Sequence, residues 1–317
     1  MALSEFSLIE RYFAPLCHNG RGVKLGIGDD CAVLEIPAGH QLAVSIDTLV
    51  EGTHFLPGTP AAAIAQRTIG ACLSDLAAMG AEPAWITLAL CLPEANEAWL
   101  KAFSNALGDV IKRWDISLVG GDTTRGEQLT ISIQVHGWVP QGQALKRSGA
   151  NTGDHIFVTG TLGDSAAGLD QLQQGHSDNW LIQRFYQPSP RLSTGIEIRP
   201  YASAAIDISD GLLADLGHIL QQSGVGAIVD LQALPLSPQL QSLYDAEQAQ
   251  QWALSGGEDF ELCFCIPESA LPEFQQQIQQ HPVPCSAIGV ITAAPGIQLQ
   301  AADGSLSNTQ PQGFRHF

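Results

Sequence analysis

The chain has few basic residues. Its 317 residues include 14 lysines and arginines against 32 aspartates and glutamates, which gives a formal net charge of −18. A surface this acidic repels a phosphate backbone and argues against a protein that binds nucleic acid. If the ligand is nevertheless a phosphate, something other than lysine and arginine must neutralise its charge.

The chain also lacks the familiar phosphate-binding and catalytic motifs. No Gly-Lys dipeptide occurs, so there is no Walker A loop, and G-x-G-x-x-G, H-E-x-x-H and G-x-S-x-G are absent as well. These motifs mark P-loop kinases, dinucleotide dehydrogenases, zincins and α/β-hydrolases. The sequence therefore argues against all four classes.

Long apolar runs are missing too. No window approaches the roughly 18 apolar residues of a membrane-spanning helix, and no basic segment precedes an apolar stretch at the N-terminus. The seven cysteines are odd in number and have no C-x-x-C spacing, which indicates small core residues in a reducing compartment rather than disulfides or zinc ligands. We therefore expect a cytoplasmic protein with no membrane partner.

What is present suffices for two domains. At about 150 residues per domain the length predicts two, and a hydrophobic share of 45% excludes intrinsic disorder. The turn-rich link 140–153 is the candidate boundary, so we expect domains at 1–147 and 148–317. Strand–helix units mix with adjacent strand pairs, which indicates α/β or α+β domains. The strand candidates are 41–47, 84–92, 116–120, 129–139, 155–160, 204–209, 227–231, 260–266 and 286–291. The helix candidates are 60–79, 94–114, 163–174, 210–223 and 268–280.

Aspartates recur at turns and expected strand ends, usually beside glycine or serine. Each one alone is typical of a turn residue or a helix N-cap. Several together, at the strand ends where α/β folds bind their ligands, indicate a shared site. The candidates are Asp29, Asp30, Asp47, Asp122, Asp207 and Asp210.

Asp75 is the most informative acid. It lies in a predicted helix that is apolar nearly all round, on one stripe with Ile64, Thr68 and Met79. A carboxylate directed toward an interior costs several kcal/mol unless it is paired. An arginine from another segment is one possible partner, and a bound divalent cation is the other.

Magnesium is the cation that this set of residues suits. Mg²⁺ prefers oxygen ligands and bridges protein carboxylates to substrate phosphates. Clustered aspartates holding several Mg²⁺ ions would then do what lysine does in a P-loop. Gly120 and Gly121 would let the backbone approach the phosphate, and the glycine-rich turn 159–168 would offer it backbone N–H groups.

Eight segments resemble the thiamine-monophosphate kinase family, which belongs to the superfamily of aminoimidazole ribonucleotide synthetase and selenophosphate synthetase. They occur in order along nearly the whole chain: GIGDD, SIDTLVEGTHF, LSDLAAMGAEP, GGDTTRG, RSGANTGD, TGTLGDSAAGL, IDISDGLLADLGHI and SGGEDFELCF. The resemblance implies transfer of the γ-phosphoryl group of ATP to the phosphate of thiamine monophosphate. It also implies a two-domain synthetase-like α/β fold, whose N-terminal sheet pairs with its copy in a homodimer.

The resemblance also implies residue roles, with several Mg²⁺ ions and an optional monovalent cation such as K⁺ as cofactors. No residue is expected to act as a general acid or base, and Asp47, Asp122 and Asp210 are expected to support Mg²⁺-assisted transfer. The implied metal ligands are Asp30, Ser45, Ile46, Asp47, Asp75, Asp122, Asp207 and Asp210. The implied nucleotide contacts are Gly121, Asp122, Arg147 and Ser209. The implied substrate contacts are His54, Glu258 and Phe314.

One departure and two alternatives stay open. Close relatives often have threonine at the position of Ile46, so a metal contact is lost if the hydroxyl is the ligand and kept if the backbone carbonyl is. The chain could be another ATP-dependent superfamily member, although no cysteine lies in a glycine-rich N-terminal loop as a selenophosphate synthetase would require. It could also be a non-catalytic nucleotide sensor, although the aspartates together with His54 and Glu258 argue against that.

Overall fold

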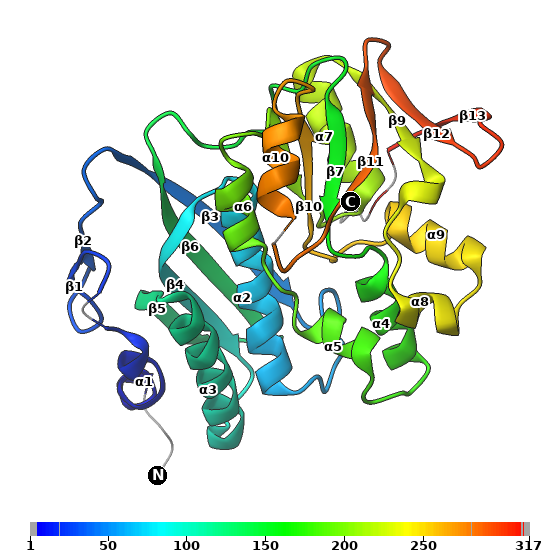
Figure 1. Cartoon of the computed structure of the whole chain (residues 1–317). Helices are drawn as coiled ribbons and strands as arrows, with labels where there is room; N and C mark the ends of the chain where they lie inside the picture. Colours follow the sequence, from blue (N-terminus) through cyan, green and yellow to red (C-terminus); the bar gives the residue numbers. More distant parts are fainter. Residues whose placement is uncertain (1–4, 19, 280, 312, 314–317) are drawn as a thin grey trace. The chain divides into compact units, whose positions relative to one another are not determined.

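The computed structural model describes residues 5–18, 20–279, 281–311 and 313. The chain forms two compact units, one of residues 1–76 and 81–142, the other of residues 77–80 and 143–317 (Figure 1). The chain thus leaves the first unit after Gly142, whereas the boundary after residue 147 stays a prediction. Each unit contains its own sheet and is described by itself below.

The first unit is built on a four-stranded sheet. Its order is β3 (His40–Val50), β6 (Thr130–Pro140), β4 (Glu82–Leu92) and β5 (Ser117–Arg125). Only β4 and β5 are parallel, and the other neighbours are antiparallel. Helices α2 (Ala61–Ala78) and α3 (Glu97–Trp114) lie over one face of this sheet (Figure 1). The four predicted strands and two predicted helices of this unit are confirmed.

Local sequence explains where these two helices end. Helix α2 follows Pro60 and is followed by Gly80, whose φ of 63° is the left-handed conformation that glycine adopts readily. Helix α3 begins at the cap Asn96, whose side chain accepts the N–H of Trp99, and ends at Asp115 in the left-handed region. The start at residue 97 rather than 94 follows from that cap.

Short N-terminal elements escape the sequence analysis. They are α1 (Glu5–Leu8), a π-helical turn (Ile9–Phe13), a 3₁₀ turn (Ala14–Leu16) and the small hairpin of β1 (Val23–Leu25) and β2 (Val33–Leu34). Elements of two to five residues carry too few positions for a periodic pattern to define their bounds.

The second unit is built on a seven-stranded sheet in the order β13-β12-β9-β11-β7-β10-β8. Only β9 and β12 are parallel, so this unit is a mixed, mostly antiparallel α+β arrangement. The strands are β7 (His155–Thr159), β8 (Ala204–Asp207), β9 (Gly226–Asp230), β10 (Leu262–Ile266), β11 (Cys285–Thr292), β12 (Gly296–Gln300) and β13 (Leu306–Thr309). The five predicted strands β7 to β11 are confirmed, and the β12–β13 hairpin was not expected.

Seven helices and a 3₁₀ turn accompany this sheet among the described residues. They are α4 (Asp164–Gln173), α5 (Trp180–Tyr186), α6 (Leu192–Ile198), α7 (Leu212–Ser223), the turn Leu231–Ala233, α8 (Pro238–Leu243), α9 (Ala246–Ser255) and α10 (Leu271–Ile278). Helices α4, α7 and α10 confirm predictions. Helices α5, α6, α8 and α9 were missed, and three of them are too short to show an amphipathic repeat.

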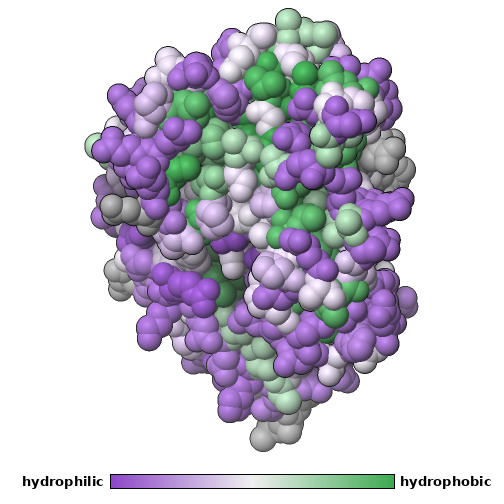
Figure 2. Space-filling view, turned by 45° about the vertical axis from the view of Figure 1, so that its right-hand side comes forward, coloured by the Kyte–Doolittle hydropathy of each residue, from purple (hydrophilic) through white to green (hydrophobic). Residues whose placement is uncertain are grey.

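The outer surface accords with the composition. Most of the face shown in Figure 2 is hydrophilic, with hydrophobic residues in separate groups. Across the described part of the chain, no helix has the length and apolar character needed to cross a bilayer. All seven cysteines are free thiols, and three of them are buried: Cys72, Cys263 and Cys265.

Candidate functional site

The GIGDD turn and the GGDT segment of β5 meet at one cavity of the first unit. Asp30, Gly121 and Asp122 line this cavity, whose volume is about 470 Å³. Apolar side chains, among them Phe13 and Leu118, form part of its wall. The structure thus brings together two predicted metal ligands, Asp30 and Asp122, and two predicted nucleotide contacts, Gly121 and again Asp122, next to apolar surface.

The two glycines of β5 meet different surroundings. A Cβ on Gly121 would lie 1.9 Å from the carbonyl oxygen of Leu88, so the close approach of β5 to β4 requires glycine there. A Cβ on Gly120 would meet nothing nearer than Cγ2 of Thr87 at 3.9 Å. Packing within the sheet is therefore sufficient reason for a glycine at position 121. At position 120 the sheet does not require glycine, and the space beside it is open to a ligand.

A second group of predicted ligands lies where β3 faces α2. The Ser45 hydroxyl donates a 2.5 Å hydrogen bond to Asp75, and both residues are partly buried. Burial, then repulsion from Asp75, raises the pKa of Asp47 to about 6, although a hydrogen bond with Cys72 acts in the opposite direction. Two mutually repelling carboxylates beside a hydroxyl are an oxygen donor set that fits a hard dication such as Mg²⁺.

Strand register keeps Asp47 and Asp122 apart within the sheet. Asp47 pairs with Ile133, Ile133 with Leu88, and Leu88 with Gly121, so Asp47 and Gly121 end one row that crosses all four strands. Asp122 belongs to the next row, and its side chain therefore points to the opposite face. Asp47 and Asp122 do not share one face of this sheet.

The expectation that these two aspartates end their strands is wrong. Strand β3 continues to Val50 and stays paired with β6 throughout, and β5 continues to Arg125 beside β4. The polar residues after Asp122 resemble a turn in sequence, but their backbones are held by the neighbouring strand. Both aspartates are thus placed by sheet pairing rather than by a loop.

Ile46 lies between Ser45 and Asp47 on β3. Its side chain is 58% exposed and, by strand alternation, points away from the face of its two neighbours. A hydrocarbon side chain has no ligand atom, so any metal contact at this position would use the backbone carbonyl.

His54 is held in a defined orientation. The backbone N–H of Val50 donates to its Nδ1 at 3.0 Å, which leaves the proton of the neutral ring on Nε2. The His54 carbonyl accepts a 3.0 Å hydrogen bond from Nε of Arg67, which is only 1% exposed. Arg67 thereby fixes the backbone of the segment that carries His54.

In the second unit, the remaining predicted aspartates surround the turn between β8 and α7. Asp207 is the last residue of β8 and is buried, and Ser209 and Asp210 follow in the turn. One oxygen of Asp215 accepts the backbone N–H groups of Ser209, Asp210 and Gly211 at 2.9, 3.0 and 3.1 Å. Burial, then repulsion from Asp210, raises the pKa of Asp215 to about 7.

Asp215 was missed by the sequence analysis. Its only signal is an acidic residue in the first turn of a helix, which is a common feature of helix N-termini. Its three backbone hydrogen bonds nevertheless fix the shape of the turn that presents Ser209 and Asp210.

Glu258 lies beside this turn, because its backbone N–H donates to the carbonyl of Ser209 at 2.7 Å. Arg147 is exposed in the segment before β7, and its carbonyl accepts a 3.4 Å hydrogen bond from the Ser223 hydroxyl. Phe314 lies outside the described residues. Within the second unit the structure thus brings Ser209, Asp210 and Glu258 together.

The glycine-rich turn before α4 does not offer the amides that we expected. The N–H groups of Gly163 and Ser165 donate to the two carboxylate oxygens of Asp259 at 2.7 and 3.1 Å. Burial raises the pKa of Asp259 to about 7, and the two N–H donors lower it. The expectation of a phosphate at these two amides is wrong, since a carboxylate of the chain occupies them.

In the described part of the chain, no group of three or more His, Cys, Asp or Glu side chains is arranged to hold a metal ion. The oxygen donors that lie together are the smaller sets given above, each within one unit. Convergence of all the predicted ligands on one site stays a prediction.

Comparison with known proteins gives the family. Residues 28–139 match the model of the AIR synthase related protein N-terminal domain, and residues 151–302 match that of the C-terminal domain. The thiamine-monophosphate kinase of Salmonella typhimurium is 50% identical over 324 aligned positions, which cover 100% of this chain and 99% of the relative.

Solved structures agree along the full length. The crystal structure of the thiamine-monophosphate kinase from Stenotrophomonas maltophilia K279a superposes with a TM-score of 0.88 at 43% identity, over 97% of this chain and 99% of that one. The complex of AaThiL with AMPPCP and TMP superposes with a TM-score of 0.79 at 32% identity, over 100% and 99%. The chain belongs to the family of AIR synthase related proteins and, within it, to the thiamine-monophosphate kinases.

Proposed function

We propose that this chain transfers the γ-phosphoryl group of ATP directly to the phosphate of thiamine monophosphate, giving thiamine diphosphate and ADP. The observation that carries the proposal is the cavity where Asp30, Gly121 and Asp122 meet, in a chain that matches thiamine-monophosphate kinases from end to end. The relative solved with AMPPCP and TMP supports the same pair of substrates.

Magnesium would be held by the aspartates. Asp47 and Asp75, with Ser45, form one donor set, and Asp30 and Asp122 line the nucleotide cavity. Asp207 and Asp210, in the second unit, complete the proposed ligands. Bound Mg²⁺ would supply positive charge for the phosphates of the two substrates in a chain that has only 14 basic residues. A monovalent cation such as K⁺ is a further proposal, tested by exchanging it for Na⁺ in the assay.

The remaining residues bind and orient the substrates. Gly121, Arg147 and Ser209 are the proposed nucleotide contacts. His54 is a proposed contact of the substrate phosphate, and the hydrogen bond from the N–H of Val50 to its Nδ1 orients the ring. The carboxylate of Glu258 is an acceptor and suits the cationic, donor-bearing part of thiamine. Phe314 stays a proposed stacking contact.

The reaction needs no general base. The second pKa of a phosphate monoester is about 6, so the attacking oxygen is largely ionised near neutral pH. The protein then contributes in-line positioning of the two phosphates and exclusion of water. We therefore assign no acid–base role to His54.

We further propose that the exposed face of the first unit's sheet pairs with a second copy of the chain. Leu42, Val44 and Ile46 alternate along β3 on the face opposite Ser45 and Asp47, and they are 44%, 49% and 58% exposed. A stripe of large apolar side chains on an open sheet face is typical of an interface between subunits.

Free cysteines fit the proposed cytoplasmic location.

The decisive experiment follows ADP and thiamine diphosphate with ATP, Mg²⁺ and thiamine monophosphate. Stoichiometric formation of both products supports the kinase. ADP formation only with another acceptor would point to a different superfamily reaction, and nucleotide binding without turnover would point to a sensor.

A further inference from the structure

Two residues next to the proposed substrate contact have an unusual backbone. Glu258 and Phe260 have φ values of 68° and 51°, in the left-handed region that side chains other than glycine rarely adopt. Such conformations are disfavoured for residues that carry a Cβ and persist only where the surroundings impose them. The segment 258–261 must therefore be held in place from both sides.

The backbone of this segment is hydrogen-bonded to the turn that carries Ser209. The N–H of Glu258 donates to Ser209 at 2.7 Å, and the N–H of Phe260 donates to the carbonyl of Ile208 at 2.9 Å. The N–H of Ile208 donates in return to the carbonyl of Glu261 at 2.7 Å. These bonds place the chain but do not by themselves select a left-handed φ.

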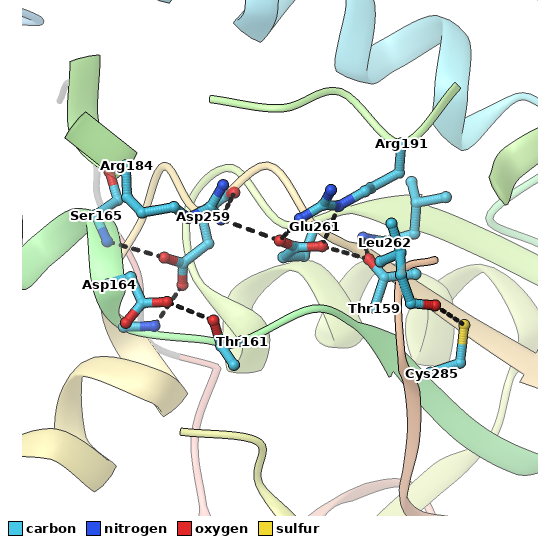
Figure 3. Close-up of polar contacts among 12 residues, drawn as sticks. Thr159, Thr161, Asp164, Ser165, Arg184, Arg191, Asp259, Glu261, Leu262 and Cys285 are labelled. Carbon is cyan, nitrogen blue, oxygen red and sulfur yellow. Dashed lines mark hydrogen bonds and ion pairs between the residues drawn. The ribbon is translucent and has the colours of Figure 1, made fainter. Parts of the chain in front are cut away.

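The intervening side chain of Asp259 is fixed inside the unit. It is 2% exposed and accepts the N–H groups of Gly163 and Ser165 at the start of α4. An anion at a helix N-terminus is stabilised by the unpaired N–H groups and by the helix dipole. Asp259 thus takes the place that a ligand phosphate occupies in other folds (Figure 3).

Glu261 is fixed still more firmly. It is fully buried, and Arg184 and Arg191 both point toward it in Figure 3. Nε of Arg191 and the hydroxyl of Thr159 each donate to it at 2.6 Å. A Cβ on Gly160 would lie 2.3 Å from its Oε1, so the carboxylate occupies space that only a glycine at position 160 leaves open.

We propose that Asp259 and Glu261 are positioning residues: by anchoring the chain on both sides of Phe260, they force Glu258 into its left-handed conformation and so aim its carboxylate at thiamine monophosphate. The inference rests on the proposed function, in which Glu258 contacts that substrate. Neither acid touches a substrate in this scheme, and both act through Glu258.

The first test is a double-mutant cycle between Asp259→Asn and Glu258→Ala. Alone, Asp259→Asn should raise the KM for thiamine monophosphate at least tenfold and change the KM for ATP less than twofold. In the Glu258→Ala background the same substitution should change the KM for thiamine monophosphate less than twofold. Equal effects in both backgrounds, or equal effects on both substrates, would overturn the proposal.

Asp154→Asn is the matched control. Asp154 is 4% exposed in the same unit, and it accepts the N–H of Asn151 at 2.9 Å and the hydroxyl of Ser203 at 2.5 Å. Asp154→Asn should lower Tm, as we expect of Asp259→Asn, yet leave the ratio of the KM for thiamine monophosphate to the KM for ATP unchanged. If it shifts that ratio equally, general loosening explains the effect and the proposal fails.

A second measurement needs no activity. Glu258→Gly should melt a few degrees above Glu258→Ala, because glycine tolerates a φ of 68° and alanine does not. In the Asp259→Asn background at least half of that difference should vanish, and a difference that persists in full would overturn the proposal. This comparison stays valid even if the wild type forms no thiamine diphosphate, which would refute the proposed function alone.

Arg191→Lys serves if Asp259→Asn does not fold. It keeps the charge but cannot donate two parallel hydrogen bonds to Glu261. The KM for thiamine monophosphate should rise about threefold or more with the KM for ATP unchanged, and an unchanged KM for thiamine monophosphate would contradict the role of Glu261.

Discussion

Asp47 and Asp75 interact as like charges where β3 faces α2, and burial together with this repulsion raises the pKa of Asp47 to about 6. Folding alone does not favour such an arrangement, because each carboxylate disfavours the ionised form of the other. A cation between them would turn the repulsion into attraction to both. The repulsion between Asp47 and Asp75 can therefore be tested by measuring Tm, with and without Mg²⁺, in the absence of substrates.

The first prediction concerns Asp47→Asn without metal. The pKa of Asp47 is about 6 in the folded state against its ordinary value of 3.8, so Asp47 favours folding most fully below pH 3.8 and loses that contribution as the pH rises through 6. Asparagine has no such loss. Between pH 4 and pH 7 the Tm of the metal-free variant should therefore rise relative to the wild type. With Mg²⁺ and both substrates present, its kcat at pH 7 should fall by orders of magnitude. A variant that unfolds instead would show that Asp47 is structural.

The second prediction concerns metal binding. Millimolar Mg²⁺ should raise the Tm of the wild type, because a ligand that binds only the folded state stabilises it. Asp75→Asn should lose most of that shift, and Asp303→Asn, an exposed aspartate hydrogen-bonded to Ser305, should keep it. Equal Mg²⁺ shifts in both variants would remove Asp75 from the proposed ligands.

The third prediction concerns the path of the phosphoryl group. Direct transfer from ATP to thiamine monophosphate passes through one in-line displacement and should invert the configuration at phosphorus. Stereochemical analysis with a chiral, isotopically labelled γ-phosphoryl group measures this. Overall retention would indicate two displacements and a phosphorylated enzyme, which the proposed roles do not include.

The fourth prediction concerns the apolar stripe on β3. Ile46→Asp adds a charge to the apolar stripe of Leu42, Val44 and Ile46, and it should shift the chain from dimer to monomer in light scattering. Thr48→Asp, also exposed on the same face but beyond the stripe, is the control and should leave the dimer intact. A wild type that is monomeric at micromolar concentration would contradict the proposed pairing.

Several elements could be predicted from sequence because one pattern determined each. Helix α2 has an apolar surface bounded by Pro60 and a left-handed Gly80, and strands such as β4 and β10 are long apolar runs. Short helices such as α5 and α8 were missed because they contain less than two helical turns. Local pattern was sufficient for most of the longer elements, and the ten-residue helix α9 is the exception.

The candidate site, too, could be predicted only in part. The segments that carry Asp30, Asp75 and Asp210 could be identified from sequence, but the residues that shape them could not. Asp215 and Asp259 act through backbone N–H groups, and the partners of Asp259 lie more than 90 residues away. No local pattern reveals such contacts, since tertiary packing creates them. The strand ends expected at Asp47 and Asp122 were wrong for the same reason, because pairing with β6 and β4 extends both strands.

The last prediction uses the two neighbouring glycines of β5. Gly121→Ala would place a Cβ 1.9 Å from the carbonyl of Leu88, so β5 must shift and stability should fall by about 1 to 3 kcal/mol. Gly120→Ala would meet only Thr87 at 3.9 Å, and its Tm should equal or slightly exceed that of the wild type. If ATP phosphates approach the backbone at this point of the cavity, Gly120→Ala should still raise the KM for ATP several-fold, because the added methyl group fills the space they need. A Gly120→Ala enzyme with unchanged KM for ATP would place the phosphates elsewhere, and calorimetric titration of the nucleotide into both variants separates lost binding from lost folding.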